Sequence, residues 1–371
     1  MCGVSNNYIL EVEMKCPALF LFSVLLVLSL TAYGYGYPGA MGQGSIMPGI
    51  DAVSHGFGGV VSVNVGSINL FGNPAELISY NPLVSASIGP LILKQIVDDG
   101  MGKHTLTYAG AGASSFQAGL SAGSAEIALG IAKVRDYTYT GERFFSESSP
   151  DTTIAGFENL TVTGGVWEAA TGAATTLAGK VNIGASAGYR MGDINYDYYW
   201  HHFSESISDS SASWGREEGE FSWRAGVSVA AGETVTVGSV YASQTENCPS
   251  SIAAGVCVGN IAAYSPGFGL EARVYDMPDG TAWSANVFGG IHPDHNLYFR
   301  GGSVLSSTGG ADSKVSLGIS MGATIELGKT DLSAAFNYGS ETRDSSVFGF
   351  PQVQTVSDVV TAFTVGASIE L

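Results

Sequence analysis

The sequence predicts an all-β protein, an antiparallel transmembrane β-barrel of about fourteen strands. Three observations predict this class: a recurring alternation of apolar with small or polar residues, a low content of charge, and a regular succession of short and long connections. Successive side chains point to opposite faces of a strand, so the alternation gives each strand one apolar and one polar face. A secreted β-sandwich or β-helix is the alternative that alternation alone leaves open.

Composition supports a membrane barrel. Only 13% of the 371 residues are charged, whereas soluble domains carry about 25%. The one long apolar run lies near the N-terminus, which excludes a helical membrane protein. A closed sheet satisfies its backbone groups without water and is compatible with lipid. The formal net charge of −18 argues against nucleic acid as a partner, because phosphate contact requires Lys and Arg.

The apolar run covers residues 17–30 and is preceded by Lys15. A basic residue, a short apolar core and small residues at a cleavable spacing predict a secretory signal peptide over residues 1–34. Met14 is then the expected start, with residues 1–13 as an upstream extension. The alternative is a retained membrane anchor, for which the apolar core is short. Export is therefore expected.

The barrel is predicted over residues 84–371, and its clearest strands lie at 181–190, 222–231, 316–326 and 358–371. In the last of these, one face carries Phe363, Val365, Ala367, Ile369 and Leu371. Glycines gather on the opposite, polar face of several strands. Because glycine is normally poor in strands, this predicts a lumen in which a plug or a ligand comes close to the wall.

Six short turns with Gly or Asn/Asp punctuate the strands at 122–124, 178–180, 231–233, 265–267, 293–296 and 328–329. Longer connections are expected around 92–103, 140–154, 193–219, 245–251, 277–280, 307–312 and 341–357. Bacterial barrels have short periplasmic turns and longer outer loops, so the two sets sort onto opposite rims. Six short turns join seven pairs of strands, which gives about fourteen strands, with twelve and sixteen as the alternatives.

Residues 35–83 are rich in Gly and Ser and alternate poorly, and Asn73-Pro74-Ala75 stands just ahead of the first strand. Together with the strand number and the terminal strand, the segment 56–77 resembles the FadL-type family, outer-membrane transporters of long-chain fatty acids and other hydrophobic compounds. The PorV-type proteins of the type IX secretion system carry a similar Asn-Pro-Ala segment. The chain departs from these families at Leu371, where an aromatic residue is usual, and at 63–69, where many relatives have an acidic run.

The resemblance implies that residues 35–83 form a plug, or hatch, with Asn73, Pro74 and Ala75 in a short helical turn inside the lumen. The residues agree, because proline suits a first helical position and asparagine is a favoured cap. A plain turn leading into the first strand is the alternative.

In the FadL-type family a kink in the third strand opens a side door. By this resemblance the candidate kink positions are Gly130 and the stretch from Lys133 to Arg135. Charge interrupts the apolar face at this stretch, after Ile127, Leu129 and Ile131.

Cys248 and Cys257 are the only cysteines of the mature chain, and export makes a disulfide between them a prediction. Two unpaired thiols are the alternative if Cys257 lies within the eighth strand. No metal is predicted: His201-His202 and His292-Pro-Asp-His295 are expected to be solvated, since a strong site needs three or four convergent ligands.

An aromatic cluster lies in the expected long loop 193–219 and comprises Tyr196, Tyr198, Tyr199, Trp200 and Phe203. It is interpreted either as a first docking surface for an apolar ligand or as an interfacial aromatic girdle.

The expected function is passive diffusion of hydrophobic small molecules past a plug, in the bacterial outer membrane. The alternatives are a PorV-type secretion shuttle or scaffold and a general diffusion porin. The sequence has no recognisable nucleophile motif, so neither an enzyme nor a cofactor is predicted. The expected partners are outer-membrane lipid, the hydrophobic ligand and the barrel-assembly machinery.

Overall fold

The computed structural model describes residues 45–46, 50–79, 83–98, 103–137, 139–149, 152–203, 208–232, 234–245, 249–263, 265–277, 280–294, 296–307, 315–345 and 354–371. The predicted signal peptide and its upstream extension lie outside the described residues. Among the described residues, no helix is both long and apolar enough to cross a membrane.

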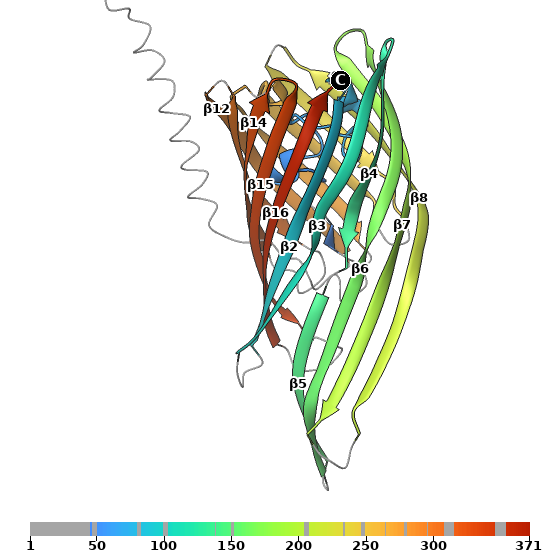
Figure 1. Cartoon of the computed structure of the whole chain (residues 1–371), viewed down its shortest axis with the longest axis vertical. Coiled ribbons are helices and arrows are strands. Elements are labelled where there is room, and N and C mark those ends of the chain that lie inside the picture. Colours follow the sequence, from blue (N-terminus) through green and yellow to red (C-terminus); the bar gives the residue numbers. More distant parts are fainter. Residues whose placement is uncertain are drawn as a thin grey trace, which may run out of the picture.

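The strands form one antiparallel sheet that closes on itself, because β4 pairs with β3 on one side and with β6 on the other. The closed ring contains fourteen strands, three (β2–β4) and eleven (β6–β16), and the predicted barrel is confirmed (Figure 1). Two further strands stand outside the ring: β1 (Ser45–Ile46) pairs with β4, and β5 (Tyr139–Ser149) pairs with β6.

The bounds of the ring strands are β2 Leu83–Asp98, β3 Lys103–Ala122, β4 Ala125–Asp136, β6 Thr152–Leu177, β7 Val181–His202, β8 Ser210–Ala230, β9 Val235–Ala242, β10 Ser251–Gly259, β11 Gly267–Met277, β12 Gly280–Asp294, β13 Leu297–Ser307, β14 Val315–Leu327, β15 Thr330–Ser345 and β16 Gln354–Glu370. The six predicted short turns all connect consecutive ring strands at one rim. The other connections between ring strands lie at the opposite rim, as predicted, but strands occupy much of the expected long connections: β2 runs to Asp98, β5 covers Tyr139–Ser149 and β15 runs to Ser345. The connection between β11 and β12 is short, from Met277 to Gly280.

The alternation in β16 sorts the side chains as predicted. Phe363, Val365 and Ile369 are 46%, 42% and 47% exposed on the outside of the barrel, whereas Thr364 between them is 1% exposed. The outward face is apolar along the ring, which suits contact with hydrocarbon rather than water.

The predicted long loop 193–219 is wrong. Residues of this segment continue β7 and β8 as a regular hairpin, with cross-strand partners from Val181↔Val229 to Trp200↔Ser210. A membrane crossing needs about 9–11 residues per strand, so β6, β7 and β8, with 26, 22 and 21 residues, extend well beyond it. Together with β5 they form a sheet that projects from the long-connection rim (Figure 1).

The hairpin of β7 and β8 keeps its cross-strand pairing beyond the membrane, while the character of its side chains changes. The outward face of β7 changes from Tyr189 and Met191 to exposed Asp193, Asn195 and Asp197. Stacked aromatic pairs such as Tyr196 with Trp214, whose ring centroids are 5.2 Å apart, stabilise the extension. The apolar alternation that marks lipid contact is therefore lost before the strand ends.

Residues 50–79 lie inside the barrel and contain a short helix, α3 (Ala52–Gly56), and a 3-10 helix, η1 (Pro74–Ser79). The helix α3 contacts β13 to β16, while η1 contacts β4, β6, β7 and β8 on the other side of the ring. Two apolar clusters join the segment to the wall: one around Phe57, Phe288 and Tyr298, and one around Leu70 and Ala170. We call residues 50–79 the lumen segment.

Candidate functional site

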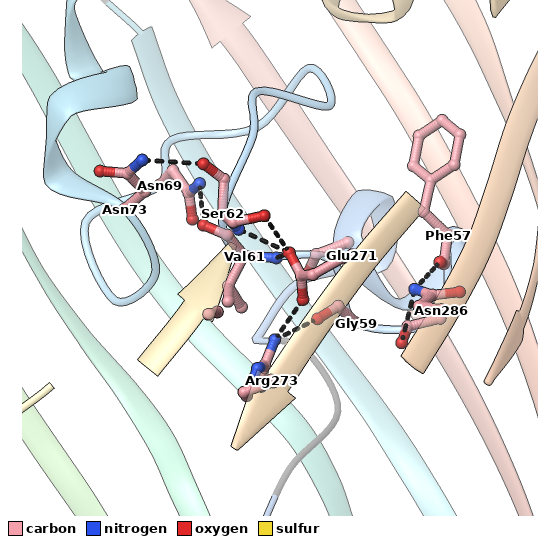
Figure 2. A network of polar contacts seen from close by, with 12 residues as sticks. Phe57, Gly59, Val61, Ser62, Asn69, Asn73, Glu271, Arg273 and Asn286 are labelled. Atoms are coloured by element: carbon pink, nitrogen blue, oxygen red, sulfur yellow. Dashed lines mark hydrogen bonds and ion pairs between the residues drawn. The ribbon is translucent and has the colours of Figure 1, made fainter. Parts of the chain in front are cut away.

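A polar network fixes the lumen segment to the barrel wall at Glu271 of β11 (Figure 2). Its carboxylate accepts hydrogen bonds from the Val61 and Ser62 amides at 2.8 and 2.7 Å and from the Ser62 hydroxyl at 2.6 Å. Arg273, two residues further on the same face, pairs with Glu271 at 2.8 Å and donates to the Gly59 carbonyl at 2.8 Å. A charged pair in the wall therefore satisfies three backbone groups of the lumen segment.

Asn73 joins two parts of the lumen segment and also bonds to the barrel wall. Its side-chain amide donates to the Ser62 carbonyl at 2.8 Å and to the Val227 carbonyl of β8 at 3.2 Å. Its side-chain oxygen accepts from the Ala75 amide at 3.1 Å, so it caps η1, which begins at Pro74. Asn73 and Ala75 have no exposed surface. The Asn-Pro-Ala tripeptide thus lies in a short helical turn inside the barrel.

Glycines in the wall permit this close approach. A Cβ atom at Gly226 would overlap the Asn73 side chain, and one at Gly184 would overlap the Pro74 backbone. A Cβ at Gly238 would overlap the Ser62 carbonyl, and one at Gly302 the Phe57 carbonyl. The glycines on the polar face therefore lie where the lumen segment touches the wall, as the sequence predicted for a plug or a ligand.

A cavity of about 120 Å³ lies between the lumen segment and the wall. We call it the arginine-lined cavity, because four arginines and an apolar set line it. These residues are Arg135, Arg190, Arg224 and Arg273, with Val60, Val61, Phe71, Val134, Val240 and Ala253 among the apolar ones. The combination of apolar side chains with a few fixed polar groups is typical of sites for small ligands.

Glu168 of β6 holds two of these arginines in place. It has no exposed surface and pairs with Arg190 at 2.9 Å and with Arg224 in a bidentate arrangement. The Arg224 guanidinium also lies over the Phe71 ring of the lumen segment, 5.8 Å from its centroid. Planar guanidinium groups fixed in this way can bind an acidic or aromatic group that enters the cavity.

The third strand is irregular next to this cavity. Pairing of β4 with β3 ends at Ser115↔Ala132, and pairing with β6 shifts register between Lys133 and Arg135. Gly130 is paired regularly on both sides. Lys133 and Arg135 are 5% and 2% exposed, whereas the preceding outward residues face lipid. The charges therefore mark the point at which the strand leaves the outer face.

The loss of pairing leaves part of β3 with one neighbour. Residues 103–114 pair with β2 alone in the described part of the chain. Beyond Ala132, β3 no longer pairs with β4, and β1 pairs with β4 there at Arg135 and Asp136. Val134 and Arg135 line the arginine-lined cavity, so the cavity reaches this irregular point of the wall.

The predicted aromatic cluster is divided between the two faces of β7. Tyr198 and Trp200 contact each other on one face, with Tyr196 at the same parity, whereas Tyr199 and Phe203 lie on the other. On that other face, Asp209 accepts hydrogen bonds from His201 at 2.9 Å and Tyr199 at 2.7 Å, which lower its pKa to about 2. The five aromatics do not form one surface.

The predicted cysteine and histidine sites are placed as follows. Cys257 lies buried within β10, the eighth ring strand, which is the condition for the two-thiol alternative. Cys248 and His295 lie outside the described residues. Within the described part of the chain, no group of three or more His, Cys, Asp or Glu side chains is arranged to hold a metal ion.

Glu76 of η1 gives the lumen segment a pH dependence. Burial raises its pKa to about 7 despite a hydrogen bond from Ser228. The folded state therefore favours protonated Glu76. The resulting stabilisation of the fold is complete below the pKa of about 4.3 that Glu76 has in the unfolded chain, and it is lost as the pH rises toward 7. We expect amide-exchange protection factors of residues 75–79 to be higher at pH 5 than at pH 8.

Burial also raises the pKa of Asp51, so the control must isolate Glu76. In a Glu76→Gln variant, the pH dependence within η1 should largely disappear while that near Asp51 remains. Equal protection of η1 at both pH values in the native chain would contradict the assignment.

These features define a class: an antiparallel barrel whose lumen is filled by its own N-terminal segment. Several solved structures are each similar to the chain over 88% of its length and 99% of theirs. They include the toluene transporter TodX of Pseudomonas putida (TM-score 0.64, 13% identity), a FadL homologue of Pseudomonas aeruginosa (0.67, 8%) and the toluene transporter TbuX of Ralstonia pickettii (0.61, 10%). At these identities the similarity shows the fold, and the predicted FadL-type architecture is confirmed.

No protein-family profile and no curated protein matches the sequence.

Proposed function

We propose that this protein is a bacterial outer-membrane channel through which hydrophobic small molecules diffuse passively past a plug formed by the lumen segment. The observation that carries the proposal is the arginine-lined cavity, which lies between the lumen segment and the wall and reaches the irregular third strand. A ligand held there would be close to the point at which β4 leaves β3. The similar solved structures include two described as toluene transporters, which supports the same class of cargo.

The cavity lining favours an amphiphile over a plain hydrocarbon. Phe71, Val240 and Ala253 offer an apolar surface, while Arg224 and Arg273 offer guanidinium groups for an acidic headgroup. A long-chain fatty acid has both parts, and its headgroup with the adjoining carbons of its chain would occupy the cavity of about 120 Å³. A toluene-like hydrocarbon would use the apolar part alone.

The exit is proposed at the third strand, where Lys133 and Arg135 mark the register shift. The entry is proposed at the projecting sheet, whose aromatics Tyr196, Tyr198 and Trp200 share one face. Outer-membrane lipid would surround the ring, and the barrel-assembly machinery would insert it. The filled lumen argues against a general diffusion porin, and the similar solved structures are channels rather than enzymes.

A substitution that fills the cavity tests the proposal. Ala253 is 2% exposed and lines the arginine-lined cavity, so Ala253→Trp places an indole in it. We expect uptake of radiolabelled oleate into proteoliposomes to fall about tenfold, since ligand pockets are small and largely preformed. Uptake of labelled toluene measures the alternative cargo in the same vesicles.

The matched control is Ile252→Trp on the same strand. Ile252 is 56% exposed on the outer face, so its replacement adds bulk on the lipid side only. Unchanged uptake in both variants would contradict the proposed route. Uptake of neither compound by the native protein would contradict the proposed cargo, and co-purification with secretion components would then favour the PorV-type alternative.

A further inference from the structure

Glu76 differs from four other buried carboxylates of the barrel. Three carboxylates on the wall each have a cation at ion-pair distance: Glu168 with Arg190 and Arg224, Glu271 with Arg273, and Asp136 with Lys133. Asp51 of the lumen segment lies in the field of Arg300. Among the described residues, no basic side chain affects the charge of Glu76, whose hydrogen-bonding neighbour is the Ser228 hydroxyl. Its counter-charge is therefore not supplied by the described wall.

The Glu76 carboxylate faces a second cavity. Glu76 is 2% exposed, and its Oε1 atom has no hydrogen-bond partner among the described residues. The cavity has a volume of about 300 Å³ and lies near the short-turn rim, between η1 and the ends of β7 to β10. Its polar lining comprises Asn64, Glu76, Asn182, Ser228, Thr236 and Asn260. We call it the turn-side cavity.

Apart from Glu76, the polar side chains that line this cavity are neutral amides and hydroxyls, which can both donate and accept hydrogen bonds. Asn182 and Ser228 are cross-strand partners, and the Asn182 amide donates to the Ser228 hydroxyl at 3.3 Å. An ionised carboxylate only accepts hydrogen bonds, and burying it without a positive partner is unfavourable. The site therefore complements a group that carries positive charge and several donors.

The volume selects the kind of cation. A single water occupies about 30 Å³ of liquid, so the cavity is too large for one bare ion. A hard metal ion usually takes several carboxylate oxygens, whereas Glu76 is the one carboxylate in this lining, and no group of three or more His, Cys, Asp or Glu side chains is arranged to hold a metal in the described part of the chain. At about 30 Å³ for each water-sized group, the cavity has room for about ten heavy atoms, which suits a small molecule.

We propose that the turn-side cavity is a binding site for a small organic cation, whose ammonium group pairs with Glu76. Its remaining donors reach the hydroxyl and amide oxygens of Ser228 and Asn182. The site lies across the lumen segment from the arginine-lined cavity and does not depend on the proposed transport of hydrophobic molecules. When Glu76 is ionised, the cation acts as its counter-charge.

Cys257 provides a reporter, because it lines the same cavity as Glu76 and its thiol lies within the electrostatic influence of that carboxylate. In a Cys248→Ser background, the purified barrel is treated with 2-aminoethyl methanethiosulfonate, a cation, or with 2-sulfonatoethyl methanethiosulfonate, an anion of similar size. The rate at which each reagent modifies Cys257 is divided by the rate at which the same reagent modifies a small thiol in solution. We expect the cation to react at least about tenfold faster than the anion.

The Glu76→Gln variant should remove this charge selectivity, and Glu76→Asp should retain most of it. Glu126→Gln is the matched control, because Glu126 is a half-buried carboxylate on β4 that accepts a hydrogen bond from Ser121, away from the turn-side cavity. Heat-modifiable mobility in gels confirms that each variant is folded. An equal ratio of rates in the native and Glu76→Gln proteins would overturn the proposal.

Calorimetric titration measures binding without a thiol reagent. Ethanolammonium chloride should bind the native barrel saturably and should bind Glu76→Gln at least about tenfold more weakly, a loss of about 1.4 kcal/mol. Ethylene glycol, which is neutral and of similar size, should not bind either protein. No saturable binding of ethanolammonium to the native barrel would overturn the proposal, whatever the labelling rates.

Discussion

Replacing Gly226 by valine is expected to unseat the lumen segment and turn the closed barrel into a conducting pore. A side chain at this position overlaps the Asn73 side chain, which caps η1 and holds the Ser62 carbonyl. Barrels of sixteen to eighteen strands leave an aqueous channel, and about fourteen strands also enclose more space than side chains of the wall can fill. The lumen segment is therefore what keeps the pore closed.

The measurement is conductance in planar bilayers. The native protein should show no large steady conductance, and Gly226→Val should raise the time-averaged conductance at least about tenfold. Ala225→Val is the matched control, because Ala225 is the outward neighbour on β8 and is exposed. A Gly226→Val protein as closed as the native one would show that the lumen segment does not close the pore.

Glu271→Ala is expected to loosen the same segment by a different mechanism. It removes the acceptor of three hydrogen bonds from Val61 and Ser62 and leaves Arg273 buried without its carboxylate. Breaking a buried ion pair by removing one partner costs about 3–5 kcal/mol. Amide exchange of residues 59–63 should therefore accelerate by about 100-fold or more.

Two further variants separate charge from hydrogen bonding at this site. Glu271→Gln keeps an acceptor oxygen without the charge and should have an intermediate effect. The double variant Glu271→Ala/Arg273→Ala should be less destabilised than the sum of the single variants, since neither charge is then left alone. Exchange of residues 59–63 that is unchanged in Glu271→Ala would mean that the network in Figure 2 does not hold the segment.

The ring could be predicted from the sequence because its signals are local. Alternation within β16 and the turns such as 178–180 depend on neighbouring residues only. The projecting sheet could not be predicted in the same way. The outward face of β7 becomes polar at Asp193. Apolar alternation therefore no longer identifies the strand beyond the membrane, and the sequence there predicts a loop.

The contacts of the lumen segment lie beyond sequence reasoning for another reason. Glu271 and Val61 are 210 residues apart, and nothing local pairs them. One signal was present: Glu271 and Arg273 occupy the polar parity of a strand whose other face carries Phe268, Leu270 and Val274. Two opposite charges on the lumen face of a strand indicate that some segment inside the barrel binds there, but they do not identify that segment. Likewise, the charges at Lys133 and Arg135 indicated an interruption but not the direction in which the strand turns.

A cross-link between the lumen segment and the wall tests the central claim most directly. A Cβ atom at Gly366 of β16 would lie 3.3 Å from the Ala52 Cβ of α3, close to the range of about 3.5–4.5 Å that disulfides require. In a Cys248→Ser background, Ala52→Cys/Gly366→Cys should oxidise to a bond joining residues 52 and 366, detected by peptide mapping, and the pore should stay closed. The pair Ala86→Cys/Ala367→Cys, which are register partners on β2 and β16, reports that the barrel itself has formed. Formation of the control bond without any bond between residues 52 and 366 would contradict a segment held inside the lumen.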